Sequence, residues 1–317
     1  MNKKISLLIV SILVSIPFWV GINLLQTKAN FLFVTNQADP SLLTAQIGQE
    51  SATSQTDCIL SGITAESFLV LKVNKQEENI SLTEKNSKGQ LPIASITKLM
   101  TYLVANEFYK NEQSIVVTKE AVEQSNTLNA LFEGDVLKVK ELIPIMLMES
   151  SNDAAFALTK VIGEEGFLEL MNLKAKELSL FNTRFYNPTG VDPEAREMPH
   201  DQINFSTAED IANLTKNLIF NQPEFLKIVS KKEFPLYKEG KIVATLKSTN
   251  ELLGETPGII GGKTGTTDRA GECLMVIMQT SQKDNYLIGV VLNSKDRFSD
   301  MKTLLRCAQE RNYLLEN

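Results

Sequence analysis

The stretch Leu91-Pro92-Ile93-Ala94-Ser95-Ile96-Thr97-Lys98 places a serine and a lysine three residues apart at the start of a helical pattern that continues to Tyr109. Side chains at this spacing share one face of a helix, so the hydroxyl of Ser95 and the amine of Lys98 can meet. The first turn of a helix also leaves backbone N–H groups free to stabilise an oxygen that becomes negative. The pattern indicates a nucleophile beside an amine base, although a serine cap followed by a surface lysine is commonplace on its own.

Two further motifs, Ser150-Ser151-Asn152 and Lys263-Thr264-Gly265, follow in that order. They supply a hydroxyl and an amide that can pass protons, and a cationic strand edge suited to an anionic acyl substrate. Ser299 to Lys302 repeats the first pattern, but it follows the Lys-Thr-Gly. Ser248 to Asn250 repeats the second pattern, but it lies too close to the Lys-Thr-Gly to leave room for a helical segment between them. Only the three motifs that begin at 95, 150 and 263 have an order and spacing that fit one cleft.

The single histidine, His200, argues against two common mechanisms. A Ser-His-Asp triad would have to use it, and a zinc peptidase needs further ligands in close spacing, which this loop does not provide. The stretch Gly261 to Thr264 resembles a phosphate-binding loop, but Pro257 stands where a Walker A motif needs glycine, and a strand follows instead of a helix. We therefore expect no metal and no cofactor. Lys98 is the natural base for Ser95 if burial or a second cation disfavours its charged form.

The composition is that of an ordinary globular protein of 317 residues, with a formal net charge of -6. No dense run of Lys or Arg is interleaved with aromatic residues, so nucleic acid is not expected as a partner. The three cysteines, Cys58, Cys273 and Cys307, form no C-x-x-C pair. They allow at most one disulfide, and the sequence favours buried free thiols.

The N-terminal residues predict export. Ile5 to Leu25 is an uncharged apolar run, preceded by Lys3 and Lys4, and is long enough to span a bilayer with the N-terminus in the cytoplasm. A cleaved signal peptide is the alternative, but Thr27-Lys28-Ala29 matches a cleavage site poorly. We expect residues 1–25 to anchor the chain in the cytoplasmic membrane, residues 26–58 to be a flexible linker, and residues 59–317 to form an extracytoplasmic domain.

The order of the expected elements predicts an α+β fold. Two strands open the domain, a helix-rich middle follows from Lys119 to Leu180, and several antiparallel strands precede a closing helix. Such an order implies an antiparallel sheet flanked by helices, with an all-helical subdomain. A capping box, Ser206 to Glu209, is expected to start one helix. The expected strands are Glu66 to Val73, Asn79 to Glu84, Glu233 to Tyr237, Ile242 to Leu246, Ile259 to Thr266, Cys273 to Thr280 and Tyr286 to Asn293, and the helices include Ile96 to Tyr109, Ser206 to Phe220 and Ser299 to Leu314.

The three motifs, their order, and the stretch Gly262-Lys263-Thr264-Gly265-Thr266-Thr267-Asp268-Arg269-Ala270-Gly271 resemble the serine D-Ala-D-Ala carboxypeptidases, the low-molecular-mass penicillin-binding proteins. The resemblance covers about residues 60 to 315 and implies a β-lactamase/transpeptidase-like fold. It also implies a substrate, the peptidoglycan stem peptide ending in D-Ala-D-Ala, and covalent inhibition by β-lactams. Many relatives continue into a C-terminal β-rich domain, whereas this chain ends after its closing helix, and we expect anchoring through the N-terminus instead.

The resemblance assigns a role to each motif residue. Ser95 would attack the carbonyl between two D-alanines, Lys98 would accept its proton, and Ser150 would relay a proton to the leaving amine. The substrate would be held by residues of the second and third motifs, with the oxyanion between the backbone amides of Ser95 and Thr266. Family members also carry an arginine before the closing helix that helps bind the terminal carboxylate; Arg297 stands at that place, and Arg269 is a rival. The expected substrate-binding residues are Asn152, Lys263, Thr264, Gly265, Thr266 and Arg297.

Three other functions stay open at this point. A class A β-lactamase would need a glutamate in a loop between the second and third motifs, but Glu164 and Glu165 open an apparent helix that runs to Leu178. An endopeptidase that cuts D-Ala cross-links shares every motif. A non-hydrolytic β-lactam sensor or wall-binding module would usually carry a larger signalling portion across the membrane.

Overall fold

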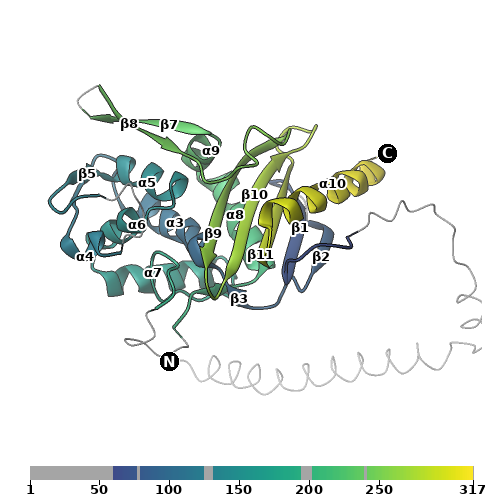
Figure 1. Ribbon diagram of the computed structural model, residues 1–317, viewed down its shortest axis with the longest axis horizontal. Coiled ribbons are helices and arrows are strands. Elements are labelled where there is room, and N and C mark those ends of the chain that lie inside the picture. The colour runs from purple at the N-terminus through teal and green to yellow at the C-terminus, as the bar shows by residue number, and fades with distance from the viewer. Residues whose placement is uncertain (1–59, 77–78, 125–130, 194–201, 239–240, 317) are drawn as a thin grey trace, which may run out of the picture. The chain divides into compact units, whose positions relative to one another are not determined.

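The structure is a computed structural model, and it describes residues 60–76, 79–124, 131–193, 202–238 and 241–316 (Figure 1). The expected membrane segment, the linker and His200 lie outside these residues. Within them, no helix combines the length and the apolar character needed to cross a membrane.

A five-stranded antiparallel sheet organises the described domain, with strand order β2-β1-β11-β10-β9 (Figure 1). The first two strands come from the start of the domain, and the other three come from its end. The central pair therefore joins residues that are more than 200 positions apart, with Ser67 opposite Leu292. The strands are β1 (Ser67–Val73), β2 (Ile80–Lys85), β9 (Ile259–Thr267), β10 (Gly271–Gln279) and β11 (Tyr286–Ser294).

Both faces of the three inner strands, β1, β11 and β10, are buried, which explains why these strands are almost continuously apolar rather than alternating. On one face Phe68, Val70 and Val276 pack against Met301 and Leu304 of the last helix, α10 (Arg297–Glu316). The other face packs against α8 (Ala208–Asn221) and continues into the core of the helices. The sheet is thus the middle layer between α10 and the rest of the helices (Figure 1).

The remaining helices gather beside β9 in a helical lobe, with a short 3₁₀ turn, η1, at the junction (Figure 1). Two short strand pairs, β3–β6 and β4–β5, tie its loops together, and the hairpin β7–β8 extends from α9. These elements are η1 (Ala94–Thr97), α3 (Lys98–Phe108), α4 (Lys119–Val122), α5 (Val139–Met148), α6 (Asn152–Thr159), α7 (Glu164–Glu177), α9 (Pro223–Val229), β3 (Leu91–Pro92), β4 (Ser114–Val116), β5 (Val136–Lys138), β6 (Phe205–Ser206), β7 (Glu233–Lys238) and β8 (Lys241–Lys247).

The expected antiparallel α+β architecture with a helical subdomain is confirmed, but several local predictions were wrong. The cap of α8 is Thr207, whose hydroxyl accepts a 3.0 Å hydrogen bond from the N–H of Asp210, so the capping box predicted from Ser206 does not form. Cys307 is disulfide-bonded and Cys273 is a buried free thiol, so the preference for free thiols holds only for the latter.

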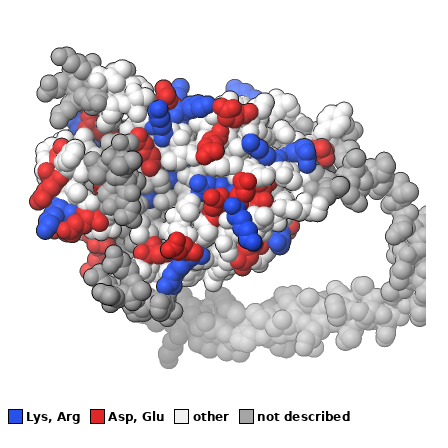
Figure 2. Space-filling view, viewed as in Figure 1, with Lys and Arg blue, Asp and Glu red and all other residues white. Residues whose placement is uncertain are grey.

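Charge is mixed over the surface in view, where Lys and Arg side chains alternate with Asp and Glu (Figure 2). One carboxylate has a clear structural use. Asp300, near the start of α10, accepts hydrogen bonds from the N–H groups of Thr64 and Ala65 and from the hydroxyl of Ser294 at 2.6 to 3.2 Å. Asp300 therefore joins the segment just before β1 to the end of β11 and to the last helix.

Candidate functional site

The first motif lies where the helical lobe meets β9. Ser95 is in the 3₁₀ turn η1 and Lys98 is the first residue of α3, so the serine precedes the α-helix instead of opening it. The Nζ atom of Lys98 is 2.7 Å from the Oγ atom of Ser95. The residue before the serine, Ala94, has a positive φ of 46°, a conformation that costs energy for a residue with a side chain and that turns the backbone into the site.

The second motif connects α5 to α6 and contacts both lysines of the other motifs. Asn152 accepts a 2.8 Å hydrogen bond from Lys98 Nζ through its Oδ1 atom, and Ser150 accepts one of 2.7 Å from Lys263 Nζ. Ser151 has a different task, because its Oγ accepts from the N–H of Ala154 and caps α6. Ser150 itself has a positive φ of 60°, which is unusual for serine and aims its side chain at the lysine.

Lys98 is fully buried and has three oxygen neighbours: Ser95 Oγ, Asn152 Oδ1 and the backbone carbonyl of Thr189, the last at 2.7 Å. Burial, and then the positive charge of Lys263, hold the pKa of its amine well below the ordinary value, against an opposing effect of Asp153. A neutral amine has two N–H groups and one lone pair. It can donate to the two oxygens that carry no proton and accept the proton of the serine.

The burial of Lys263 follows from the sequence around it on β9. Residues 261, 263 and 265 point to the same face of the strand. On that face the lysine lies between two glycines, Gly261 and Gly265. A Cβ on Gly265 would lie 2.8 Å from the backbone nitrogen of Ser95, and one on Gly261 would lie 2.8 Å from Val229 of α9. The two glycines thus let η1 and α9 close over the lysine, and burial together with Arg297 lowers its pKa to about 7.

The rest of the third motif carries hydroxyls along the same strand. Thr264 Oγ1 is 2.6 Å from Thr249 Oγ1, and the N–H of Thr249 donates to the carbonyl of Met148 at the end of α5. Thr266 is exposed, and its hydroxyl accepts from Arg297, which also donates to the carbonyl of Gly265 at 3.0 Å. The structure thus brings Arg297 to the third motif, beside the other expected catalytic and substrate-binding residues, whereas the backbone N–H of the rival Arg269 donates to Asp192.

Three contributors were missed. Thr189 acts through its backbone carbonyl, which leaves no signature in a sequence. Gly190 follows it with a φ of +83°, and a Cβ there would lie 1.9 Å from the carbonyl oxygen of Ala94, so only glycine fits against η1. Thr249 lay inside the serine–asparagine pattern that was set aside as a decoy.

Asp153, directly after the second motif in the first turn of α6, does more than begin a helix. The side chain is fully buried, and its Oδ2 atom accepts a 3.0 Å hydrogen bond from the N–H of Leu131. It is a buried negative charge in the helical lobe that opposes the lowering of the pKa of Lys98.

The fold and this arrangement of motifs are those of the penicillin-binding proteins. The chain belongs to peptidase family S11, D-alanyl-D-alanine carboxypeptidase, whose model matches residues 50–296. The structure of penicillin-binding protein D2 from Listeria monocytogenes in its cefotaxime-bound form superposes with a TM-score of 0.65 at 28% identity, covering 78% of this chain and 97% of that one.

Two curated relatives give the same family. D-alanyl-D-alanine carboxypeptidase DacF of Bacillus subtilis is 34% identical over 61% of this chain and 49% of its own length. DacC of Escherichia coli is 34% identical over 71% of this chain and 56% of its own length. The chain thus spans about half the length of these relatives.

Proposed function

We propose that the chain is a serine-type D-Ala-D-Ala carboxypeptidase that removes the terminal D-alanine from peptidoglycan stem peptides. The observation that carries the proposal is the buried amine of Lys98, 2.7 Å from Ser95 Oγ and held by two further oxygens. The family and the names of the relatives agree with this activity.

In the first step, the lone pair of Lys98 takes the proton of Ser95 while Oγ attacks the carbonyl carbon of the penultimate D-alanine. Two N–H groups on the amine keep their acceptors, Asn152 and the Thr189 carbonyl, so the lone pair stays directed at the serine. The oxyanion forms beside the backbone N–H of Ser95, which faces Gly265, with the N–H of Thr266 as the second donor. A preorganised donor of this kind is worth roughly 3 kcal/mol in the transition state.

In the second step, the C–N bond breaks and the leaving D-alanine takes a proton. Ser150 supplies it and is resupplied by Lys263, whose Nζ is 2.7 Å from the serine hydroxyl. A pKa of about 7 suits this lysine for giving and taking a proton near neutrality. Water then attacks the acyl carbonyl, and the proton that it loses restores the charge of Lys263. As the ester C–O bond breaks, Lys98 returns its proton to Ser95 Oγ, which restores the hydroxyl and the neutral amine.

The terminal carboxylate of the substrate would bind at the far end of β9. Thr264 and Thr266 present hydroxyls there, and Arg297 and Lys263 supply positive charge. β-Lactams carry a carboxylate and a strained amide in the same relation, which makes them covalent inhibitors of the same serine. The Listeria protein was crystallised in cefotaxime- and ampicillin-bound forms.

An endopeptidase that cuts D-Ala cross-links is the second candidate. Relatives from Pseudomonas aeruginosa and Haemophilus influenzae are named D-alanyl-D-alanine endopeptidases, at 27% and 32% identity. The two activities use the same chemistry and differ in whether the leaving group is a free D-alanine or a cross-linked peptide. Incubation with pentapeptide and with cross-linked muropeptides, followed by product analysis, separates them.

We also propose that residues 1–25 anchor the chain in the bacterial cytoplasmic membrane and that residues 26–58 tether an extracytoplasmic domain of residues 59–317. The uncharged run Ile5 to Leu25 after two lysines supports the anchor. The disulfide at Cys307 supports an oxidising compartment. Alkaline extraction of membranes and protease treatment of spheroplasts test the anchoring and the side.

The activity is tested by labelling with fluorescent penicillin, mapping of the adduct, and measurement of D-alanine release from a pentapeptide. Ser95→Ala should abolish both labelling and release. Ser299→Ala is the matched control, because it removes the exposed serine of the other Ser-x-x-Lys pattern, which lies in α10. An adduct on a residue other than Ser95, or release that survives Ser95→Ala, would refute the assignment.

A further inference from the structure

A cavity of about 670 Å³ lies between the helical lobe and the hairpin, and no residue of the three motifs lines it. Its walls come from α3, α5, α9 and β7, with Ile143, Pro144, Phe234 and Leu236 among the apolar side chains. The volume is in the range of sites for small organic molecules, roughly 300–1,000 Å³.

One buried polar group borders this cavity without a partner. Tyr102 on α3 is fully buried, its ring packs on Phe225 with 5.4 Å between centroids, and its hydroxyl makes no hydrogen bond with any residue in the described ranges. Buried hydroxyls in proteins are nearly always hydrogen-bonded. Burial, and then the negative charge of Glu224, raise the pKa of this phenol, so it stays protonated and keeps an unused hydrogen-bond donor at the cavity wall.

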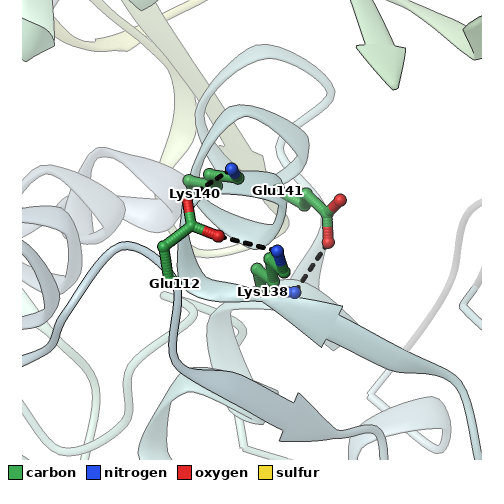
Figure 3. Close-up of polar contacts among 4 residues, drawn as sticks. All are labelled: Glu112, Lys138, Lys140 and Glu141. Atoms are coloured by element: carbon green, nitrogen blue, oxygen red, sulfur yellow. Dashed lines mark hydrogen bonds and ion pairs between the residues drawn. The ribbon is translucent and has the colours of Figure 1, made fainter. Parts of the chain in front are cut away.

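The charged side chains that line the cavity, except Glu141, are already in ion pairs. Figure 3 shows Glu112 between Lys138 and Lys140 and hydrogen-bonded to both, while Glu141 turns its carboxylate to the backbone nitrogen of Lys138 at 2.7 Å. On the opposite wall, Lys227 pairs with a glutamate of α9 at 2.6 Å. A charged ligand would have to break one of these pairs, so the rim favours an uncharged one.

The wall formed by β7 disfavours a peptide as occupant. An extended peptide would bind by adding a strand to the hairpin, but Pro235 in the middle of β7 has no N–H to donate. The occupant must therefore be recognised by shape, apolar contact and a hydrogen bond from the tyrosine.

From these observations we infer that the cavity is a second binding site, separate from the catalytic groove, for a small uncharged aromatic molecule that carries a carbonyl or similar acceptor. The apolar walls hold the aromatic body, and Tyr102 donates to the carbonyl. The site borders α3 one turn beyond Lys98 and α5 two turns before Ser150.

The probe for this site is 6-propionyl-2-(dimethylamino)naphthalene, a neutral aromatic ketone whose fluorescence shifts to the blue in apolar surroundings. The purified full-length chain should give a saturable signal with one site per chain. Tyr102→Phe should weaken binding about 3- to 10-fold, the effect of one hydrogen bond. Tyr109→Phe is the matched control, since Tyr109 is also buried, its hydroxyl has no partner among the described residues, and it does not line the cavity. Binding by this variant should stay within about twofold of wild type.

Leu236→Trp, on the hairpin and only partly buried at the margin of the main core, fills the cavity and should remove the saturable signal. All proteins are measured in the same detergent, so partition of the probe into micelles cancels in the comparison. Acylation with benzylpenicillin beforehand should leave binding unchanged. Absence of saturable binding, equal binding by Tyr102→Phe and wild type, or displacement by benzylpenicillin would each overturn the inference, whether or not the carboxypeptidase activity is found.

Discussion

The stability of this fold should depend on the ionisation of Lys263, and the replacement Lys263→Met tests this. The amine is fully buried and its pKa is about 7, against 10.5 for a free lysine. The unfolded chain therefore binds a proton more tightly than the folded chain between pH 7 and pH 10, and stability rises with pH across that window. At pH 7 the buried amine costs about 4 kcal/mol, and at pH 10 it costs only about 1 kcal/mol.

Methionine keeps most of the volume and removes the ionisable group. It also removes the hydrogen bonds from Nζ to Ser150 and to the Thr264 carbonyl, each worth about 0.5–1.5 kcal/mol at either pH. These losses cancel when the same variant is compared at two pH values. The stability of Lys263→Met relative to wild type should therefore be about 3 kcal/mol more favourable at pH 7 than at pH 10. Lys98 adds to this difference in the same direction. Loss of the Lys263 charge raises the lowered pKa of Lys98, which also favours the variant at pH 7.

The assay is urea unfolding of the purified chain at pH 7 and pH 10, followed by circular dichroism. Lys176→Met, at an exposed position on α7, is the control and should show no difference between the two pH values. A change below about 1 kcal/mol for Lys263→Met would mean that the folded protein does not hold this amine at a lowered pKa. The proton relay through Ser150 would then need another explanation.

Three further outcomes are expected. Gly190→Ala should cost about 2–5 kcal/mol of stability in chemical unfolding, because the added Cβ would meet the backbone of η1. Gly163→Ala is the control: its φ is also positive but the space around it is open, so it should cost only about 1–2 kcal/mol. Ser151→Ala should lose about 1 kcal/mol of stability as a helix cap yet keep penicillin acylation. Ser150→Ala should lose a similar amount, about 0.5–1.5 kcal/mol, with its hydrogen bond to Lys263, but it should also slow D-alanine release at least about 100-fold. The opposite effects on activity would reverse their roles. Thr249→Val should raise the KM for pentapeptide about 3- to 10-fold and leave kcat nearly unchanged; a fall in kcat alone would place this threonine in the chemical step instead.

Much of the architecture could be read from local patterns. Apolar runs separated by polar turns located the strands of the sheet, and the spacing of Ser95 and Lys98 placed both on one side of the groove. Such features depend on neighbours in sequence. The cap of α8 was misplaced by one residue because Ser206 and Thr207 are both good caps, and the choice depends on tertiary hydrogen bonds.

The parts of the site that could not be predicted depend on contacts between distant segments. The carbonyl of Thr189 reaches Lys98 across 91 positions and carries no side-chain signal. Asp153 resembles an ordinary helix-start residue, and only the packing of the lobe shows that it is buried. The cavity beside Tyr102 is formed by α3, α5, α9 and β7 together, so the sequence of any one of them does not predict it.

The hydrogen bonds of Asp300 determine how a force on the N-terminal part of the chain would reach the domain. A force on the chain ahead of residue 60 would reach the domain through Thr64 and Ala65. The Asp300 carboxylate holds both residues to α10, and the Thr64 hydroxyl also bonds to Ser294 at the end of β11. The strand that follows, β1, is separated from β9 by two other strands. A force on this part of the chain would thus be borne at Asp300, and α10 would pass it on to the groove, because Arg297 at the start of the same helix donates to the Gly265 carbonyl and to the Thr266 hydroxyl of β9.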